Sequence, residues 1–140
     1  MRPLFSLGPR LALCAALVRE GSPLCDVGTD HAYLPIWLLK TGKVPRALAC
    51  DINPGRDGAK YEVGEALSFR LSDGLRAVLP QEAGDVVLAG MGGELILRIV
   101  GETPWLRDGA KRLVLQPMSS VAELRRGLAE LGFQVLQEQA

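Results

Sequence analysis

The chain has 140 residues, of which 48% are apolar and 23% are charged, and its 16 basic residues balance 16 acidic ones. This length supports one hydrophobic core and predicts a single domain over residues 1–140. The apolar content excludes an intrinsically disordered chain, because disordered segments are too polar to offset their ordering entropy. The zero net charge gives no overall attraction to nucleic acids or membranes, so such a partner would need a local basic patch.

The cysteine pattern and the N-terminal segment favour a cytoplasmic protein. Cys14, Cys25 and Cys50 form no C-x-x-C pair, so we expect no disulfide framework and no zinc site, and predict small buried side chains. Pro3 and Pro9 interrupt the start before a signal-peptide core can form. No apolar run reaches the roughly 18 residues of a membrane span. We therefore expect neither a metal nor a membrane partner, and we favour a monomer.

Helices and strands are predicted to alternate along the chain. Apolar residues at helical spacing predict a first helix over Pro9–Glu20, which Gly21 would end in a left-handed cap. Short apolar runs followed by turn residues predict strands, and the stretches between them predict helices. In chain order these are strand Leu24–Val27, helix Leu34–Thr41, strand Ala47–Ile52, strand Leu67–Leu71, helix Gly74–Leu79, strand Asp85–Ala89, helix Glu94–Val100, strand Arg112–Gln116, helix Ser120–Leu131 and strand Phe133–Gln137.

The last helix and the strands indicate the fold class. A capping box from Ser120 to Glu123 begins the helix and Gly132 ends it. The strands are apolar throughout, which is typical of parallel strands buried on both faces. Alternation of such strands with helices predicts a doubly wound α/β domain with a mostly parallel sheet. Sheets of this type bind ligands beyond the carboxyl ends of their strands.

Polar residues and glycines follow the predicted strands. The strand ends are Asp26–His31, Asp51–Gly55, Ser72–Gly74, Gly90–Gly93 and Gln116–Met118. Turn chemistry explains part of this pattern, since Gly, Asp and Asn are frequent in turns. Because the pattern recurs at every strand end, it favours a ligand site at one edge of the sheet.

The residues after the first strand disfavour a dinucleotide. NAD sites use G-x-G-x-x-G, but Asp30 and Tyr33 stand where the second and third glycines belong, and Asp30 would repel a pyrophosphate. The P-loop pattern for ATP is also missing. S-adenosylmethionine has no phosphate and carries a positively charged methionine end, so acidic strand ends suit it better.

The acidic residues have distinct roles in such a site. Asp26 or Asp30 would balance the positive methionine end, and Gly28 would admit the cofactor past the strand. Asp51 would accept the ribose hydroxyls, and Asp73 would accept a hydrogen bond from the adenine amino group. Alternatively, Asp26 and Asp51 are turn or cap residues, and Asp73 caps the helix that follows it.

The same strand ends resemble one enzyme family, the bacterial tRNA (adenine-22-N1)-methyltransferases. The resemblance lies in the motifs Asp26–Pro35 (D-V-G-T-D-H-A-Y-L-P), Asp51–Gly55, Ser72–Leu75, Ala89–Gly93 (A-G-M-G-G) and Leu115–Met118. It implies a Rossmann-like class I methyltransferase fold that uses S-adenosylmethionine to methylate N1 of adenine 22 in tRNA. The implied cofactor-binding positions are Asp26, Gly28, Asp51, Ile52, Ser72, Asp73 and Gly90. We add the adjacent Thr29, Asn53 and Gly74 as candidate cofactor-binding residues.

The fourth strand end favours a ring nitrogen as methyl acceptor. Gly90–Gly93 lacks the Asn/Asp-Pro-Pro-aromatic pattern of enzymes that methylate the exocyclic amino group of adenine. N1 carries a lone pair, so the reaction needs placement more than a strong base. Asp30 or His31 would take up the released proton, although His31 is equally well explained as a helix-start residue. Met91 would line the pocket for methyl transfer or fill the space at the carboxyl end of the sheet. The candidate catalytic residues are Asp30, His31, Gly90 and Met91.

Two features depart from this family. Only Ile52–Ala66 connects the second and third strands, which is short for a parallel crossover, so we expect residues to be missing after Gly55. Family members continue with a further strand and a helical domain, so the C-terminal part of the fold is also expected to be missing after Ala140. The basic residues near the site would form a small patch or, as we favour, scattered surface charge; they are Arg46, Arg56, Lys60, Arg98 and Arg107.

Two alternative functions follow from these observations. One is a non-catalytic methyltransferase-fold module for RNA or protein binding, which the short crossover and the expected missing end would suit. The other is an NAD-dependent oxidoreductase of the same fold class, supported by Asp51 and opposed by the absent glycines.

Overall fold

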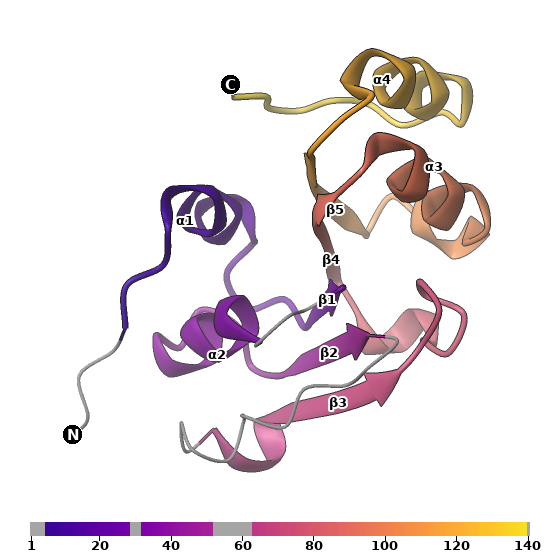
Figure 1. The fold of residues 1–140 in the computed structure, drawn as a ribbon. Coiled ribbons are helices and arrows are strands. Elements are labelled where there is room, and N and C mark those ends of the chain that lie inside the picture. Colours follow the sequence, from indigo (N-terminus) through magenta and orange to yellow (C-terminus); the bar gives the residue numbers. More distant parts are fainter. Residues whose placement is uncertain (1–4, 29–31, 52–62, 140) are drawn as a thin grey trace.

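The computed structural model describes residues 5–28, 32–51 and 63–139 (Figure 1). Its centre is a parallel sheet of five strands in the order β3-β2-β1-β4-β5. The strands are β1 (Leu24–Val27), β2 (Ala47–Asp51), β3 (Leu67–Leu71), β4 (Asp85–Met91) and β5 (Arg112–Pro117). The chain builds outward from β1 to β3, then returns to place β4 on the other side of β1, so the strand order reverses between β1 and β4. The predicted doubly wound α/β fold is confirmed.

Helices cover both faces of this sheet (Figure 1). The α-helices are α1 (Pro9–Leu17), α2 (Tyr33–Lys40), α3 (Gly93–Gly101) and α4 (Val121–Glu130), and short 3-10 helices are η2 (Gly64–Ala66), η3 (Pro80–Glu82) and η4 (Pro104–Arg107). Side chains of α1 and α2 share one buried cluster with Leu24 and Val87, whereas those of α3 and α4 share another with Cys25 and Val86. Neighbouring strand residues therefore point into two cores, which explains why the strands are apolar throughout.

The amino end of the sheet contains an ion pair between a fully buried carboxylate and a partly exposed guanidinium. Asp85, the first residue of β4, is 0% exposed. The Arg19 side chain donates from Nε to Asp85 Oδ1 at 2.8 Å, and the Arg19 backbone N–H donates to Oδ2 at 2.8 Å. The same guanidinium donates to the carbonyls of Gly84 and Ala110. This pairing fixes the segment after α1 to the start of β4.

The prediction that the three cysteines are small buried side chains is confirmed. Cys14, Cys25 and Cys50 are free and buried. The sulfur atoms of Cys25 and Cys50 lie 3.6 Å apart on neighbouring strands, in hydrogen-bonding contact.

Two predicted elements are wrong. Instead of a helix, residues 74–77 form turns and residues 78–79 have no regular structure, because Gly74 has a left-handed φ of +60° and Pro80 holds Leu79 extended. No strand forms over Phe133–Gln137, where Val135 and Leu136 are 57% and 66% exposed. A strand without a pairing partner and without a buried face has little to stabilise it.

Two predicted helix ends also differ. The first helix ends at Leu17, and Gly21, although left-handed, donates its N–H to the carbonyl of Lys43 instead of capping the helix. Ser120 precedes α4 without a capping box, because its hydroxyl donates to Glu94 of α3. The predicted stop is confirmed, since Gly132 follows α4 with a φ of +92°.

Candidate active site

The carboxyl ends of all five strands lie along one edge of the sheet, because every strand pair is parallel. This edge brings together β1, β2 and β4 around the reversal of strand order, where ligands bind in sheets of this class. The described candidates at this edge are Asp26, Gly28, Asp51, Ser72, Asp73, Gly74, Gly90 and Met91. Thr29, Asp30, His31, Ile52 and Asn53 lie outside the described residues.

The end of β1 is a buried carboxylate followed by a tight glycine. Asp26 is 7% exposed. Gly28 has a φ of +75° and donates its N–H to the carbonyl of Cys50 at 2.8 Å. A Cβ at Gly28 would lie 3.0 Å from the terminal methyl of Met91. The absence of a side chain at Gly28 therefore lets Met91 of β4 come close to the end of β1, beside the edge where a cofactor would bind.

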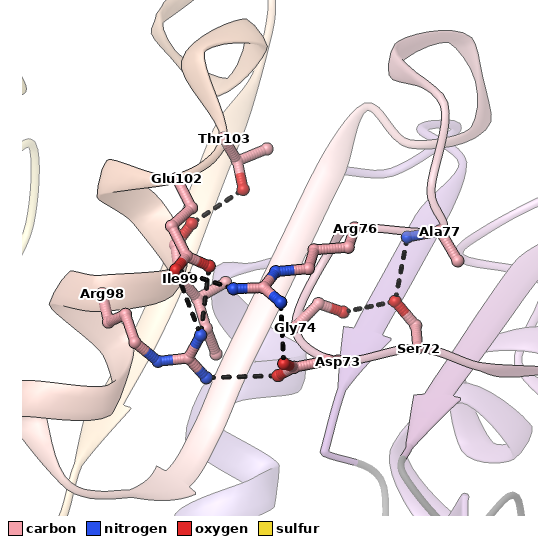
Figure 2. A network of polar contacts seen from close by, with 9 residues as sticks. All are labelled: Ser72, Asp73, Gly74, Arg76, Ala77, Arg98, Ile99, Glu102 and Thr103. Atoms are coloured by element: carbon pink, nitrogen blue, oxygen red, sulfur yellow. Dashed lines mark hydrogen bonds and ion pairs between the residues drawn. The ribbon is translucent and has the colours of Figure 1, made fainter.

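The ends of β2 and β3 are joined by a backbone hydrogen bond. The half-buried Asp51 ends β2, and its carbonyl accepts the N–H of Ser72 at 3.0 Å. Ser72 is 6% exposed. Its hydroxyl donates to the carbonyl of Gly74 at 2.9 Å and accepts the N–H of Ala77 at 3.2 Å (Figure 2). Ser72 thus fixes the turn that carries Asp73.

The Asp73 carboxylate lies between two guanidinium groups (Figure 2). Its Oδ1 is 3.2 Å from Arg98 Nη2, and its Oδ2 is 3.3 Å from Arg76 Nη1. Glu102 contacts both arginines in turn, at 3.0 Å from Arg76 and 3.1 Å from Arg98. The hydrogen bond to Asp73 raises the pKa of Arg98, and the hydrogen bond from Arg76 lowers the pKa of Glu102. Arg98 is thus an exposed residue that pairs with two acidic side chains.

The end of β4 is irregular, and its register with β5 shifts between Ala89 and Met91. Gly90 has a φ of +74° and donates its N–H to the side-chain oxygen of Gln116 at 3.0 Å. The same oxygen accepts a hydrogen bond from Arg10 Nη1 at 3.2 Å. A Cβ at Gly90 would lie 2.5 Å from Arg10 Nη1. Sequence reasoning missed Arg10, whose position on α1 gave no signal that its guanidinium covers the fourth strand end.

The glycines after Met91 serve the packing of the fold. Gly93 donates its N–H to the carbonyl of Ser119 at 2.9 Å, and a Cβ at Gly93 would lie 2.6 Å from the carbonyl oxygen of Ser120. The hydrogen bond from Ser120 lowers the pKa of the Glu94 carboxyl at the start of α3. Part of the G-M-G-G motif is thus explained by the close approach of the loop before α4.

Comparisons with known proteins identify the family. Residues 7–140 match the family model described as a methyltransferase domain. The chain belongs to the methyltransferase domain family. This methyltransferase domain is 32% identical over 138 residues to the tRNA (adenine(22)-N(1))-methyltransferase of Bacillus subtilis, covering 94% of this chain and 58% of that protein. The resemblance inferred from the five motifs is confirmed.

Solved structures agree with this assignment. The crystal structure of the Bacillus subtilis M1A22 tRNA methyltransferase TrmK has a TM-score of 0.88 at 31% identity, covering 94% of this chain and 59% of that one. A putative tRNA (m1A22) methyltransferase of Streptococcus pneumoniae, solved in complex with S-adenosyl-L-methionine, has a TM-score of 0.87 at 36% identity, covering 94% and 65%. The methyltransferase domain thus spans roughly three fifths of the length of these relatives.

The described part of the chain contains neither a metal-binding cluster nor a helix suited to span a membrane. Within residues 5–28, 32–51 and 63–139, no group of three or more His, Cys, Asp or Glu side chains is arranged to hold a metal ion. Across the same ranges, none of the helices has the length and apolar character needed to cross a membrane.

Proposed function

We propose that this chain is the catalytic domain of an S-adenosylmethionine-dependent enzyme that methylates N1 of adenine 22 in tRNA. One observation carries the proposal: the acidic and glycine strand ends that suit this cofactor lie along one edge of the sheet, in a fold that matches a relative solved with S-adenosyl-L-methionine at a TM-score of 0.87. We further propose that residues 1–140 act as one domain in the cytoplasm, where tRNA is found. The monomer remains a prediction that light scattering tests.

The described residues fit S-adenosylmethionine. Gly28 leaves open the space beside Met91 that a Cβ would fill. Asp26 supplies negative charge for the amino group of the methionine end, and Asp51 supplies carboxylate oxygens for the ribose hydroxyls. Asp73 supplies an acceptor for the adenine amino group. When bound, the cofactor would supply an electrophilic sulfonium methyl group, which the lone pair of a ring nitrogen can attack.

The end of β4 would position the target adenine. Gln116 holds this turn by accepting the N–H of Gly90, and the guanidinium of Arg10 lies where a Gly90 side chain would be, so the base would meet the turn beside Arg10. Correct placement of the adenine lowers the activation barrier for methyl transfer, because N1 must attack the methyl group in line with its bond to sulfur. Met91 lies on the Gly28 side of the same turn, where it would pack beside the reacting groups. We retain Asp30 and His31 as candidates to take up the released proton.

Transfer of a labelled methyl group to an unmodified tRNA transcript tests the function. We expect incorporation into a transcript with adenine at position 22, recovered as N1-methyladenine after digestion. A transcript that carries guanine at position 22 is the control, and it should remain unlabelled. Equal labelling of both transcripts would contradict the proposed target, and labelling of neither would favour the non-catalytic module.

A further inference from the structure

Four charged residues form a closed cycle of ion pairs beside the candidate cofactor site. The ion-pair cycle consists of Asp73, Arg76, Glu102 and Arg98, each in contact with the next (Figure 2). Asp73 and Arg76 belong to the loop after β3, whereas Arg98 and Glu102 belong to α3 and its C-terminal cap. The cycle therefore connects the loop that carries Asp73 to a helix on a different part of the chain.

The backbone around the cycle is also held in place. Gly74 is left-handed, and a Cβ there would lie 3.0 Å from Ile99 of α3, so the loop approaches the helix closely. The Thr103 hydroxyl donates to the carbonyl of Ile99 at 2.7 Å and secures the end of α3. The hydrogen bonds of Ser72 hold the loop itself, and the two arginines hold the Asp73 side chain that the loop carries.

We propose that Arg98, assisted by Arg76 and Glu102, is a positioning residue that holds Asp73 as an acceptor for the 6-amino group of the cofactor's adenine. This inference rests on the proposed function. Each Asp73 oxygen contacts one guanidinium and keeps a lone pair for a ligand, because an ionised carboxylate has about four acceptor sites. The Asp73 side chain is 48% exposed, so a ligand can reach it.

The proposal predicts how the site discriminates between purines. A carboxylate accepts the N–H of a 6-aminopurine, but it repels the oxygen of a 6-oxopurine, which is also an acceptor. S-adenosylhomocysteine should therefore bind more tightly than S-inosylhomocysteine, by about tenfold or more for a hydrogen bond to a charged group. Loss of Arg98 should reduce the ratio of the two affinities, S-adenosylhomocysteine over S-inosylhomocysteine, by about threefold, as expected for a half-exposed ion pair.

Calorimetric titration of both ligands tests the proposal. We expect Arg98→Ala to weaken the binding of S-adenosylhomocysteine and to leave the binding of S-inosylhomocysteine unchanged. The affinity of Arg98→Lys for S-adenosylhomocysteine should lie between those of the wild type and Arg98→Ala. Asp73→Asn should remove or invert the preference, because an amide can donate to the 6-oxo group. Arg125→Ala is the matched control, since Arg125 pairs with Glu138 at 2.8 Å and its loss changes the net charge equally.

The outcomes separate this proposal from the proposed function. A reduced ratio in Arg98→Ala, with the wild-type ratio kept in Arg125→Ala, would support the positioning role. An unchanged ratio, or equal weakening of both ligands, would overturn it and leave cofactor binding intact. Failure of the wild-type protein to bind S-adenosylhomocysteine would overturn the proposed function and this inference together.

Discussion

The two ends of the parallel sheet use acidic side chains in opposite ways. At the amino end, Asp85 is fully buried and bound by both the side chain and the backbone of Arg19. At the carboxyl end, the Asp73 side chain is 48% exposed and keeps acceptor capacity beside its two arginines. The same residue type thus stabilises the fold at one end and is available to a ligand at the other.

Solvation explains this difference. A carboxylate removed from water needs full hydrogen bonding, and it destabilises the protein strongly when one partner is lost. A half-exposed carboxylate contributes little to stability, because water replaces a lost partner. Substitutions at the amino end should therefore affect unfolding, whereas those at the carboxyl end should affect ligand binding.

The largest effect is expected at Asp85. Asp85→Ala removes the acceptor of both the Arg19 backbone N–H and its guanidinium, and we expect a loss of about 2 kcal/mol in the free energy of unfolding, measured by urea denaturation. Asp85→Asn keeps a hydrogen-bond acceptor and should lose less. A loss below about 1 kcal/mol in Asp85→Ala would contradict the structural role of the amino end.

Asp51 should show the opposite behaviour. We expect Asp51→Ala to weaken S-adenosylhomocysteine by about 30-fold, from the loss of hydrogen bonds to a charged group, while its unfolding free energy changes by less than about 1 kcal/mol. Calorimetry and urea denaturation measure the two effects. Asp108→Ala, which removes an acid from an exposed loop, is the control with unchanged affinity. Wild-type affinity in Asp51→Ala would contradict the assignment of Asp51 to the ribose hydroxyls.

Gly28 allows backbone strain to be separated from ligand contact. Gly28 and Gly42 have nearly equal φ values of +75° and +76°, but a Cβ would meet Met91 at Gly28 and only open space at Gly42. An alanine at either position should cost about 1 kcal/mol of stability. Only Gly28→Ala should also weaken S-adenosylhomocysteine. Equal affinities in the two variants would show that Gly28 does not border the cofactor.

The smallest effect is a pH dependence at the amino end. Hydrogen bonds from Arg70 lower the pKa of the Glu82 carboxyl, so its contribution to stability is fully present above its unfolded pKa and is lost as the pH falls through its folded pKa. We expect Glu82→Gln to cost about 0.5–1 kcal/mol at neutral pH. The difference from wild type should shrink below about pH 4. A constant difference between pH 7 and pH 3 would refute this account.

Most of the fold could be predicted from the sequence because local patterns determine it. Uniformly apolar strands identify a parallel sheet, and the turn residues after them mark its carboxyl edge. The predictions failed where distant contacts or chain geometry decide the structure. Ser120 bonds to Glu94 instead of closing a capping box, and Pro80 keeps the segment before it from forming a helix. Neither outcome follows from periodicity.

The candidate site was predictable to the extent that its residues follow strands directly. Asp26, Asp51 and Asp73 stand at strand ends in the sequence and meet one edge of the sheet in the structure. Their partners were not predictable in this way, because Arg10 and Arg98 reach the edge from helices. A single charged residue on a helix face gives no sequence signal of what it will contact.

Calorimetric titration of S-adenosylhomocysteine and of NADH into the wild-type protein tests the central claim most directly. If the carboxyl edge of this sheet is built for a cofactor without phosphates, S-adenosylhomocysteine binds with one site per chain and NADH does not bind. Binding of NADH in the absence of S-adenosylhomocysteine binding would contradict the account and favour an oxidoreductase.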